Sequence, residues 1–413
     1  MVMVKIPLVA GEVVAAGVDA QAYLRPGSLQ LRALPPLALY VHFPWCIRKC
    51  PYCDFNSHEH TGGTGAIPEA EYLDALRADL ESALPLIWGR KIVSVFIGGG
   101  TPSLLSADGL ERLLSDVRAL LPLEADCEIT LEANPGTVEA DRFAAYRASG
   151  VNRLSIGIQS FDDEMLTRLG RIHDRSEALR AVEVAQRNFE GFNLDLMFAL
   201  PEQTLAQAHA DLDQALALAP PHLSLYQLTL EPNTVFAKFP PPLPDEDTAA
   251  LMQEAIVART SAAGYRHYEV SAYSKPGHEC RHNLNYWNFG DYLGIGAGSH
   301  SKLSFPHRVV RQVRFKQPVS YLAQARQRQF VAESFEVGRA DLPFEFMLNA
   351  LRLNAGFAPR LFPERTGLAI TAIESALDKA EARGLIERRL DLIRPTSLGQ
   401  RFLSDLQQLF LAG

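Results

Sequence analysis

From Leu37 onward, short apolar runs alternate with longer segments of helical period. Apolar runs rich in β-branched residues are typical of buried strands, whereas apolar residues at steps of three and four are typical of helices packed on a sheet. The runs predict six strands, at Leu37 to Phe43, Ile92 to Ile97, Glu128 to Leu131, Arg153 to Ile158, Asn193 to Phe198 and Leu223 to Thr229. The clearest helices are predicted at Glu69 to Leu84, Ala107 to Leu120 and Leu205 to Leu218. This alternation predicts an α/β fold of repeated βα units on a parallel sheet.

Each of the first five predicted strands is followed at once by cysteine, glycine or polar residues. These groups occupy residues 45–53, 98–102, 132–135, 159–161 and 201–204. In a barrel of the TIM type the loops after the strands converge around one mouth, where functional sites are built. Six units predict a partial (β/α)6 barrel rather than a closed eightfold one.

The pattern divides the chain into four expected regions. They are an N-terminal extension at 1–36, a partial barrel at 37–263, a β-extension with a connecting segment at 264–340, and a small C-terminal domain at 341–413. The segment from Tyr265 to Leu303 has the pattern of strands and glycine-rich loops. A polar hairpin near Glu387 to Arg394, among helical segments, predicts a winged-helix-like fold for the last region.

Composition narrows the class of protein. The net charge of -8 and the lack of a basic run argue against a nucleic-acid partner. Three of the five cysteines fall within eight residues, which favours a reduced metal site in the cytoplasm over a disulfide framework. The apolar stretch from Ile6 to Val18 is interrupted by Gly11 and Glu12, and fits neither a signal peptide nor a membrane span. We therefore expect no integral membrane segment, while peripheral membrane contact stays open.

The three clustered cysteines are Cys46, Cys50 and Cys53, directly after the first predicted strand. Three thiolates from one loop can bind three irons of a four-iron, four-sulfur (4Fe-4S) cluster and leave the fourth iron open. A zinc site would need a further ligand, for which His58 and His60 are candidates, and a redox pair would not need Cys46. The spacing and its place after a strand favour the cluster.

The motifs resemble the radical-SAM family that contains oxygen-independent coproporphyrinogen III oxidase and the related haem chaperones. The resemblance rests on residues 40–53, Gly98 to Pro102 and Leu200 to Thr204. It implies that the open iron binds S-adenosylmethionine and that Tyr40, Gly99 and Glu132 contact this cofactor. It also matches positions that line a second nucleoside site in the oxidase branch, here Tyr52, Gly100, Thr101, Gln159, Arg171 and Asp195. Glycines at 98–100 would let the backbone approach the methionine moiety closely.

Two positions depart from the family pattern. Phe55 stands where the oxidase branch has a further cysteine, so that a thiol is missing from the edge of the expected active site. Ala199 stands where the family loop often carries glycine.

A second group of candidate residues lies far along the chain. An imidazole can ligate haem iron and aromatic rings can stack on a porphyrin. The run His-Asn-x-x-Tyr-Trp resembles the haem-associated motif of the chaperone branch, here His282, Asn283, Tyr286 and Trp287. The alternative is a set of core aromatics beside a hydrogen-bonded histidine. Cys280 is either a second iron ligand or a buried thiol.

The resemblance implies two candidate functions. The first is a haem chaperone that carries haem to an acceptor protein, and the second is oxygen-independent coproporphyrinogen III oxidase. Phe55 and the motif at His282 favour the chaperone, and whether the chain is an enzyme stays open. A third class, nucleic-acid binding through the arginines near 383–394, is disfavoured by the net charge.

Overall fold

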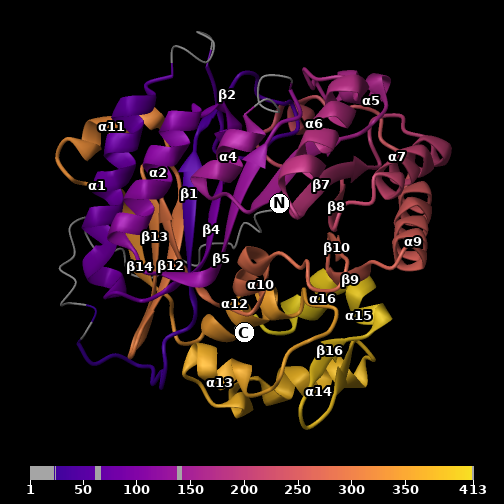
Figure 1. Ribbon diagram of the computed structural model, residues 1–413. Helices are drawn as coiled ribbons and strands as arrows, with labels where there is room; N and C mark the ends of the chain where they lie inside the picture. Colours follow the sequence, from indigo (N-terminus) through magenta and orange to yellow (C-terminus); the bar gives the residue numbers. More distant parts are fainter. Residues whose placement is uncertain (1–22, 24, 61–66, 137–141, 412–413) are drawn as a thin grey trace.

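The computed structural model describes Tyr23 and residues 25–60, 67–136 and 142–411. The predicted apolar stretch at 6–18 lies outside these residues. At the centre is a twelve-stranded sheet (Figure 1) in the order β14-β13-β12-β11-β1-β4-β5-β6-β7-β8-β10-β9. Six consecutive strands of this sheet are parallel to one another: β1 (Leu37–Phe43), β4 (Ile92–Gly99), β5 (Leu123–Ala133), β6 (Arg153–Gln159), β7 (Gly191–Phe198) and β8 (His222–Gln227). This is the predicted partial barrel.

The sheet continues beyond the barrel on both sides. Next to β1 lies β11 (Asp291–Ile295), parallel to it, followed by the antiparallel strands β12 (His300–Phe305), β13 (Arg308–Arg314) and β14 (Val331–Glu336). Next to β8 lie the antiparallel strands β10 (Ala272–Ser274) and β9 (Arg266–Glu269). A separate short pair, β2 (Trp45–Cys46) and β3 (His58–Glu59), frames the cysteine loop.

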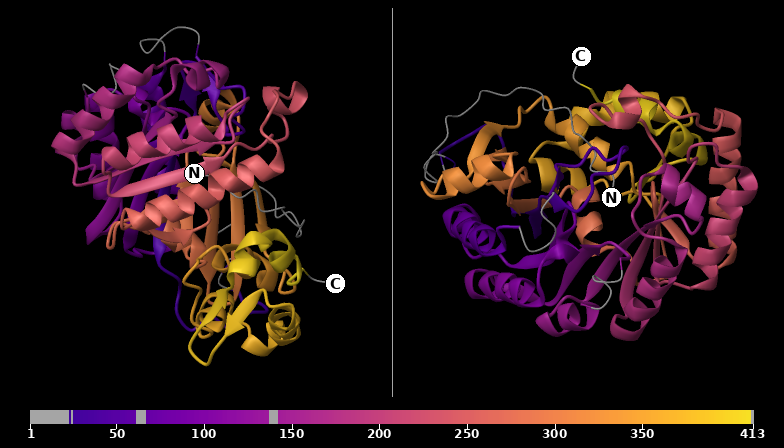
Figure 2. Two further views of the ribbon diagram at one scale, coloured as in Figure 1. Left: turned by 90° about the vertical axis from the view of Figure 1, so that its right-hand side faces the viewer. Right: turned by 90° about the horizontal axis from the view of Figure 1, so that it is seen from above.

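Helices cover the outer, convex side of the barrel (Figures 1 and 2). The main ones are α1 (Glu69–Ile87), α2 (Ala107–Leu120), α4 (Phe143–Ser149), α6 (Arg175–Asn188), α7 (Leu205–Ala217) and α9 (Glu246–Ala262). In α1 the buried residues Tyr72, Leu76, Leu80 and Ile87 recur at steps of four, four and seven, which places them on one stripe facing the sheet. Other helices are α5 (Asp163–Arg168), α8 (Val235–Lys238) and α11 (Pro318–Ala325).

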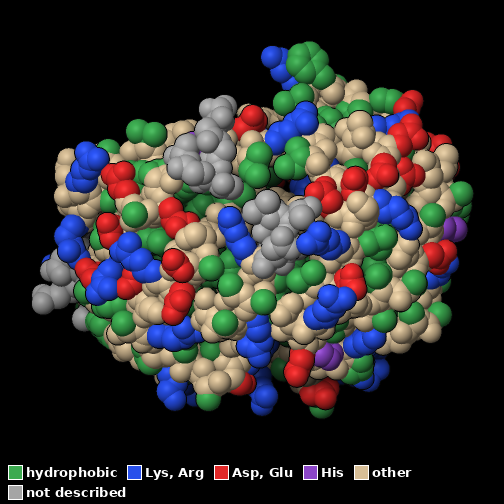
Figure 3. All heavy atoms as spheres, turned by 45° about the horizontal axis from the view of Figure 1, so that its top comes forward, with side chains coloured by type: hydrophobic (Ala, Val, Ile, Leu, Met, Phe, Trp, Pro, Cys, Tyr) green, Lys and Arg blue, Asp and Glu red, His purple; other side chains and the backbone are tan. Residues whose placement is uncertain are grey.

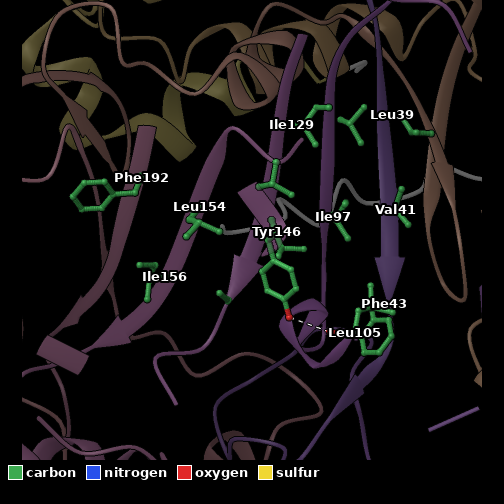
Figure 4. Packing of buried hydrophobic residues seen from close by; sticks show 14 of the residues in the cluster. Leu39, Val41, Phe43, Ile97, Leu105, Ile129, Tyr146, Leu154, Ile156 and Phe192 are labelled. Carbon is green, nitrogen blue, oxygen red and sulfur yellow. Dashed lines mark hydrogen bonds between the residues drawn. The ribbon is translucent and has the colours of Figure 1, made fainter. Parts of the chain in front are cut away.

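The largest hydrophobic core lies between the sheet and these helices. Figure 4 shows Leu39 and Val41 of β1 beside Ile97 of β4 and Ile129 of β5, all buried. Tyr146 of α4 joins this core, and its hydroxyl donates to the carbonyl oxygen of Leu105 at 3.0 Å. The tyrosine therefore packs its ring in the core without leaving its hydroxyl unpaired.

The C-terminal region forms a second core, below the barrel in Figure 1 and in the left view of Figure 2. Its elements are α12 (Leu342–Ala350), α13 (Leu361–Thr366), α14 (Glu374–Ala382), β15 (Ile386–Arg388), β16 (Ile393–Pro395), α15 (Ser397–Arg401) and α16 (Leu403–Gln408). The strands β15 and β16 pair as a hairpin, as predicted near this position. Leu29 and Leu31, which precede the barrel, belong to this core and donate backbone hydrogen bonds to the carbonyls of His307 and Pro306.

One helix, α10 (Arg281–Trp287), interrupts a segment for which we expected only strands and glycine-rich loops. Its N-cap residue Cys280 makes no side-chain capping bond. Instead the carboxylate of Glu128 in β5 accepts backbone hydrogen bonds from Arg281 (3.3 Å) and His282 (3.2 Å). An acidic group at this end also favours the helix electrostatically. The expectation was wrong because the helix is short and its stabilising partner lies about 150 residues earlier in the chain.

The surface and the helices also bear on possible environments. On the face shown in Figure 3, basic and acidic side chains are interspersed. Within the described part of the chain, no helix has both the length and the apolar character that crossing a bilayer requires.

Candidate cofactor cavity and buried aromatic helix

A cavity of about 480 Å³ lies where the parallel strands of the barrel end. This is the edge at which the sequence predicted a site, and the volume suits a small-molecule ligand. Eleven of the predicted site residues line it: Cys46, Cys50, Cys53, Tyr52, Gly99, Gly100, Thr101, Glu132, Gln159, Arg171 and Asp195. Tyr40 and the four residues predicted to contact haem do not.

The three cysteines are free thiols on the loop that follows β1. Burial raises the pKa of the Cys46 thiol to about 11 and also raises that of Cys53, so binding iron would displace their protons. Among the described residues, no three His, Cys, Asp or Glu side chains converge on a single metal ion. A 4Fe-4S cluster does not require such convergence, because each thiolate binds a different iron.

Each cysteine sulfur has a polar neighbour. The Thr101 hydroxyl donates to Cys46 Sγ at 3.4 Å, and Arg171 Nη1 donates to Cys50 Sγ at 3.5 Å. The Ser57 hydroxyl lies 3.7 Å from Cys53 Sγ. Donors of this kind stabilise thiolates, so the loop suits a group that binds all three sulfurs in their anionic form.

The glycines at the end of β4 are required by the protein itself. A side chain at Gly99, whose φ is +117°, would meet the imidazole ring of His42 at 2.5 Å. A side chain at Gly100 would meet the carbonyl oxygen of Trp45, also at 2.5 Å. The close approach that these residues permit is therefore between β4 and the chain around β1, rather than only between backbone and ligand.

Two carboxylates face the cavity from β5 and β7, the two strands that flank β6. Glu132, at the end of β5, accepts a hydrogen bond from the Gly99 backbone N–H at 3.0 Å, and burial raises the pKa of its carboxyl to about 7. Asp195 accepts bonds from Ser155 Oγ and Asn193 Nδ2, both at 2.8 Å. Both carboxylates are held in place by the protein, and both can accept hydrogen bonds from a ligand.

The two departures from the family pattern have structural counterparts. Phe55 lines the cavity, so an aromatic ring occupies the edge where the oxidase branch has a thiol. Ala199, directly after β7, has a φ of +55°, in the left-handed region that favours glycine. This conformation accounts for glycine at that position elsewhere.

Tyr40 lies beneath the cavity rather than in its wall. Its hydroxyl is 3.1 Å from His42 Nδ1, and its ring stacks near Phe96 with centroids 6.2 Å apart. The ring of His282 in α10 lies 6.4 Å from that of Tyr40 and is itself stacked on Phe96. Tyr40 therefore belongs to the aromatic cluster around α10 and does not line the cavity.

The helix α10 packs against β1, β4 and β11, near the starts of the strands, at the end of the barrel away from the cysteine loop. His282 is fully buried, with Nδ1 at 3.0 Å from Ser94 Oγ and its ring stacked on Phe96 at 4.9 Å. Burial, with a smaller effect of Arg153, lowers its pKa to about 3, so the imidazole is neutral. Its Nε2 atom has no hydrogen-bond partner among the described residues.

The other predicted haem contacts are packed into the protein to different degrees. Trp287 is buried under the guanidinium of Arg352, which lies 4.2 Å from the ring centroid and pairs with Glu269 at 3.1 Å. Tyr286 packs on Tyr292 with ring centroids 4.3 Å apart, while Asn283 is half-buried. The Cys280 thiol donates to Glu128 at 3.6 Å.

The sequence analysis did not name several cavity residues, among them Ser155, Met197 and Tyr226, and it included Asn134 only within the group at 132–135. All lie on or directly after the predicted strands. In a strand, alternate side chains face the same side, so Ser155, Gly157 and Gln159 share the inner face of β6. This period-2 register, applied to each strand, would have found them.

The fold and the cysteine loop together define a radical-SAM protein. The Radical SAM superfamily model matches residues 40–215, and the HemN C-terminal domain model matches residues 337–402. Among solved structures, coproporphyrinogen III oxidase from Escherichia coli, described as a radical SAM enzyme, superposes with a TM-score of 0.77 at 23% identity. That match covers 91% of this chain and 90% of the other, and it shows the shared fold.

Several bacterial relatives that are more similar in sequence share one name. The chain is 50% identical to heme chaperone HemW of Escherichia coli, over 92% of this chain and 99% of the relative. It is 48% identical to that of Haemophilus influenzae, with 92% and 98% covered, and 32% identical to that of Bacillus subtilis, with 90% and 98% covered. The chain belongs to this HemW family.

Proposed function

We propose that this chain is a haem chaperone, which binds haem and transfers it to an acceptor protein. The observation that carries the proposal is its similarity to proteins named heme chaperone over nearly the whole length of both chains. Phe55 in the cavity wall supports it, because the position that carries a thiol in the oxidase branch is apolar here. The acceptor would be a haem protein that receives its cofactor from this chain.

We propose further that Cys46, Cys50 and Cys53 hold a 4Fe-4S cluster with S-adenosylmethionine on its open iron. The buried thiols and their donors fit the cluster, and the superfamily match supports the pair of cofactors. When reduced, such a pair is a source of radical chemistry. Glu132 and the Gly99 backbone, joined by a hydrogen bond, would orient the methionine end of the cofactor, and Asp195 would face its nucleoside part.

The haem site is proposed at His282, Asn283, Tyr286 and Trp287. A neutral imidazole with an unpaired Nε2 has the chemistry of an iron ligand. In the described structure, however, the ring is enclosed by Phe96, Tyr40 and Tyr286. Ligation by His282 therefore requires α10 to move away from the barrel. The C-terminal domain that covers Trp287 would either move with the helix or stay in place.

The second candidate function is radical decarboxylation of coproporphyrinogen III. The observation in its favour is the fold shared with the Escherichia coli oxidase. A shared fold does not carry function, because different chemistries use the same barrel.

Anaerobic reconstitution with iron and sulfide separates the two functions. Haem is added to one sample, and coproporphyrinogen III with S-adenosylmethionine and a reductant to another. A Soret band that shows haem binding, followed by transfer of the haem to an apo-haemoprotein, supports the chaperone. Decarboxylated product without stable haem binding supports the oxidase.

We also propose a cellular compartment. The clustered free thiols support our proposal that the protein works in the reducing cytoplasm.

A further inference from the structure

Asn134 lies between two of the side chains that donate to the cysteine sulfurs. Its Nδ2 donates to Thr101 Oγ1 at 3.0 Å, and its Oδ1 accepts from Arg171 Nη2 at 2.7 Å. It follows β5 directly, two residues after Glu132, and its backbone N–H donates to Ser103 Oγ at 3.3 Å. One amide group thus bridges the neighbours of Cys46 and Cys50.

The chemistry of these groups fixes the direction of every bond. A guanidinium has donors and no acceptor, so the amide oxygen of Asn134 must face Arg171 and its NH₂ must face Thr101. Because the Thr101 oxygen accepts from that NH₂, its single proton is left for Cys46 Sγ, 3.4 Å away. Arg171 is held by Asn134 and by the Gly157 carbonyl through Nη2, which leaves Nη1 directed at Cys50 Sγ.

We propose that Asn134 is a positioning residue that directs two hydrogen bonds onto the cluster thiolates and thereby raises the reduction potential of the cluster. Donors to the sulfurs reduce the electron density that the thiolates place on iron, which favours the reduced state. The inference rests on the proposed cluster at Cys46, Cys50 and Cys53, but on neither haem nor catalysis. It assigns Thr101 and Arg171 a role toward the cluster beside the nucleoside contacts that the family resemblance implies.

Asn134→Asp is the sharpest variant, because it keeps the shape but offers only acceptors. The carboxylate still accepts from Arg171, but it now also takes the Thr101 proton, so Cys46 loses its donor. Thr101→Val removes the same donor without adding charge, and Thr101→Ser keeps the hydroxyl. Asn188→Asp makes the same change on the outer helix α6, where the Asn188 amide donates to a backbone carbonyl, and serves as the matched control.

The measurement is a redox titration of the reconstituted cluster by electron paramagnetic resonance, without S-adenosylmethionine. At the wild-type midpoint we expect the ratio of reduced to oxidised cluster to fall about tenfold in Asn134→Asp, equivalent to about 59 mV for a one-electron couple. Thr101→Val should shift in the same direction by less, while Thr101→Ser and Asn188→Asp stay near wild type.

The double variant Asn134→Asp with Thr101→Val separates positioning from charge. If Asn134 acts through Thr101, the Asp substitution shifts the potential less in the Val background than in wild type. Equal shifts in both backgrounds, or unchanged potentials in single variants that carry full iron, would overturn the proposal. If Asn134→Asp binds no cluster, the reduction potentials of Thr101→Val and Thr101→Ser are compared instead. Equal potentials in these two variants would overturn the proposal. A wild-type protein that holds no cluster would overturn the proposed cofactor as well.

Discussion

The two ends of the barrel differ in whether their candidate ligand-binding side chains line a cavity or are enclosed by the protein. At the end with the cysteine loop, Cys46, Glu132 and Asp195 line a cavity. At the other end, His282 and Trp287 are enclosed by the sheet and by Arg352. Loops after strands can therefore accept a ligand without altering the packing of the fold. A ligand for the buried helix must instead compete with contacts that stabilise the protein.

The largest expected effect lies at the cysteine loop. Replacing Cys46, Cys50 and Cys53 together by Ala should abolish the cluster, since each thiolate binds one iron and no nearby cysteine replaces it. Iron and sulfide content and the visible absorbance after reconstitution measure this. Cys127→Ala and Cys280→Ala are controls that should keep the cluster, and a triple variant with wild-type absorbance would refute the assignment.

At the buried helix we expect His282→Gln to weaken haem binding by at least about tenfold, or about 1.4 kcal/mol, because an iron ligand is lost. The Soret maximum should move, whereas the cluster should be unaffected because the helix does not line the cavity. His209→Gln, on the outer helix α7, is the matched control. Unchanged haem affinity and spectrum would exclude His282 as the ligand and favour a haem site elsewhere.

Glu132 should make binding of S-adenosylmethionine depend on pH. Its pKa is raised to about 7, chiefly by burial, so the carboxylate that attracts the cofactor's ammonium group forms only as the pH rises through that value. If only the charged form binds, affinity should rise about tenfold between pH 6 and pH 8. Calorimetric titration of the reconstituted protein tests this. Glu132→Gln should bind weakly at both values, and a steep pH dependence in that variant would assign the titration to another group.

The smallest expected effect is on the free energy of unfolding, measured by replacing each of two tryptophans. Trp287→Phe should lower the free energy of unfolding by about 1 kcal/mol, through a smaller buried ring and a weaker contact with Arg352. Trp88→Phe, at a residue 53% exposed, should change it by less than about 0.5 kcal/mol. Urea unfolding of both variants gives the difference. Equal effects would mean that the packing around α10 contributes little to stability.

Sequence pattern predicted the barrel well where apolar residues dominate a strand. The bounds of β1 and α2 are those predicted, whereas β5 begins at Leu123, five residues before the predicted Glu128. Glu124 and Asp126 lie in that first part of the strand and hid it, because they break the apolar run. The start of β5 pairs with β4, a contact that the local pattern does not contain.

The same limit explains the candidate site. Residues directly after strands could be placed around one mouth, because parallel strands end together. The position of α10 depends on Glu128 and on packing against β4, both distant in sequence, so the motif at His282 could be matched to a family but not located. Likewise, the bridge made by Asn134 appears only once Thr101 and Arg171 are brought within hydrogen-bond distance.

The irregular segment before the barrel has a practical consequence for shortening the chain. A protein trimmed to begin at Leu37 would keep every motif of the barrel. It would lack Leu29 and Leu31, however, which are buried in the C-terminal core. Burial of two such side chains contributes about 1.5–3 kcal/mol each, besides their two backbone hydrogen bonds to the turn between β12 and β13. Such trimming would loosen the domain that covers Trp287, at the opposite end of the sequence from the cut.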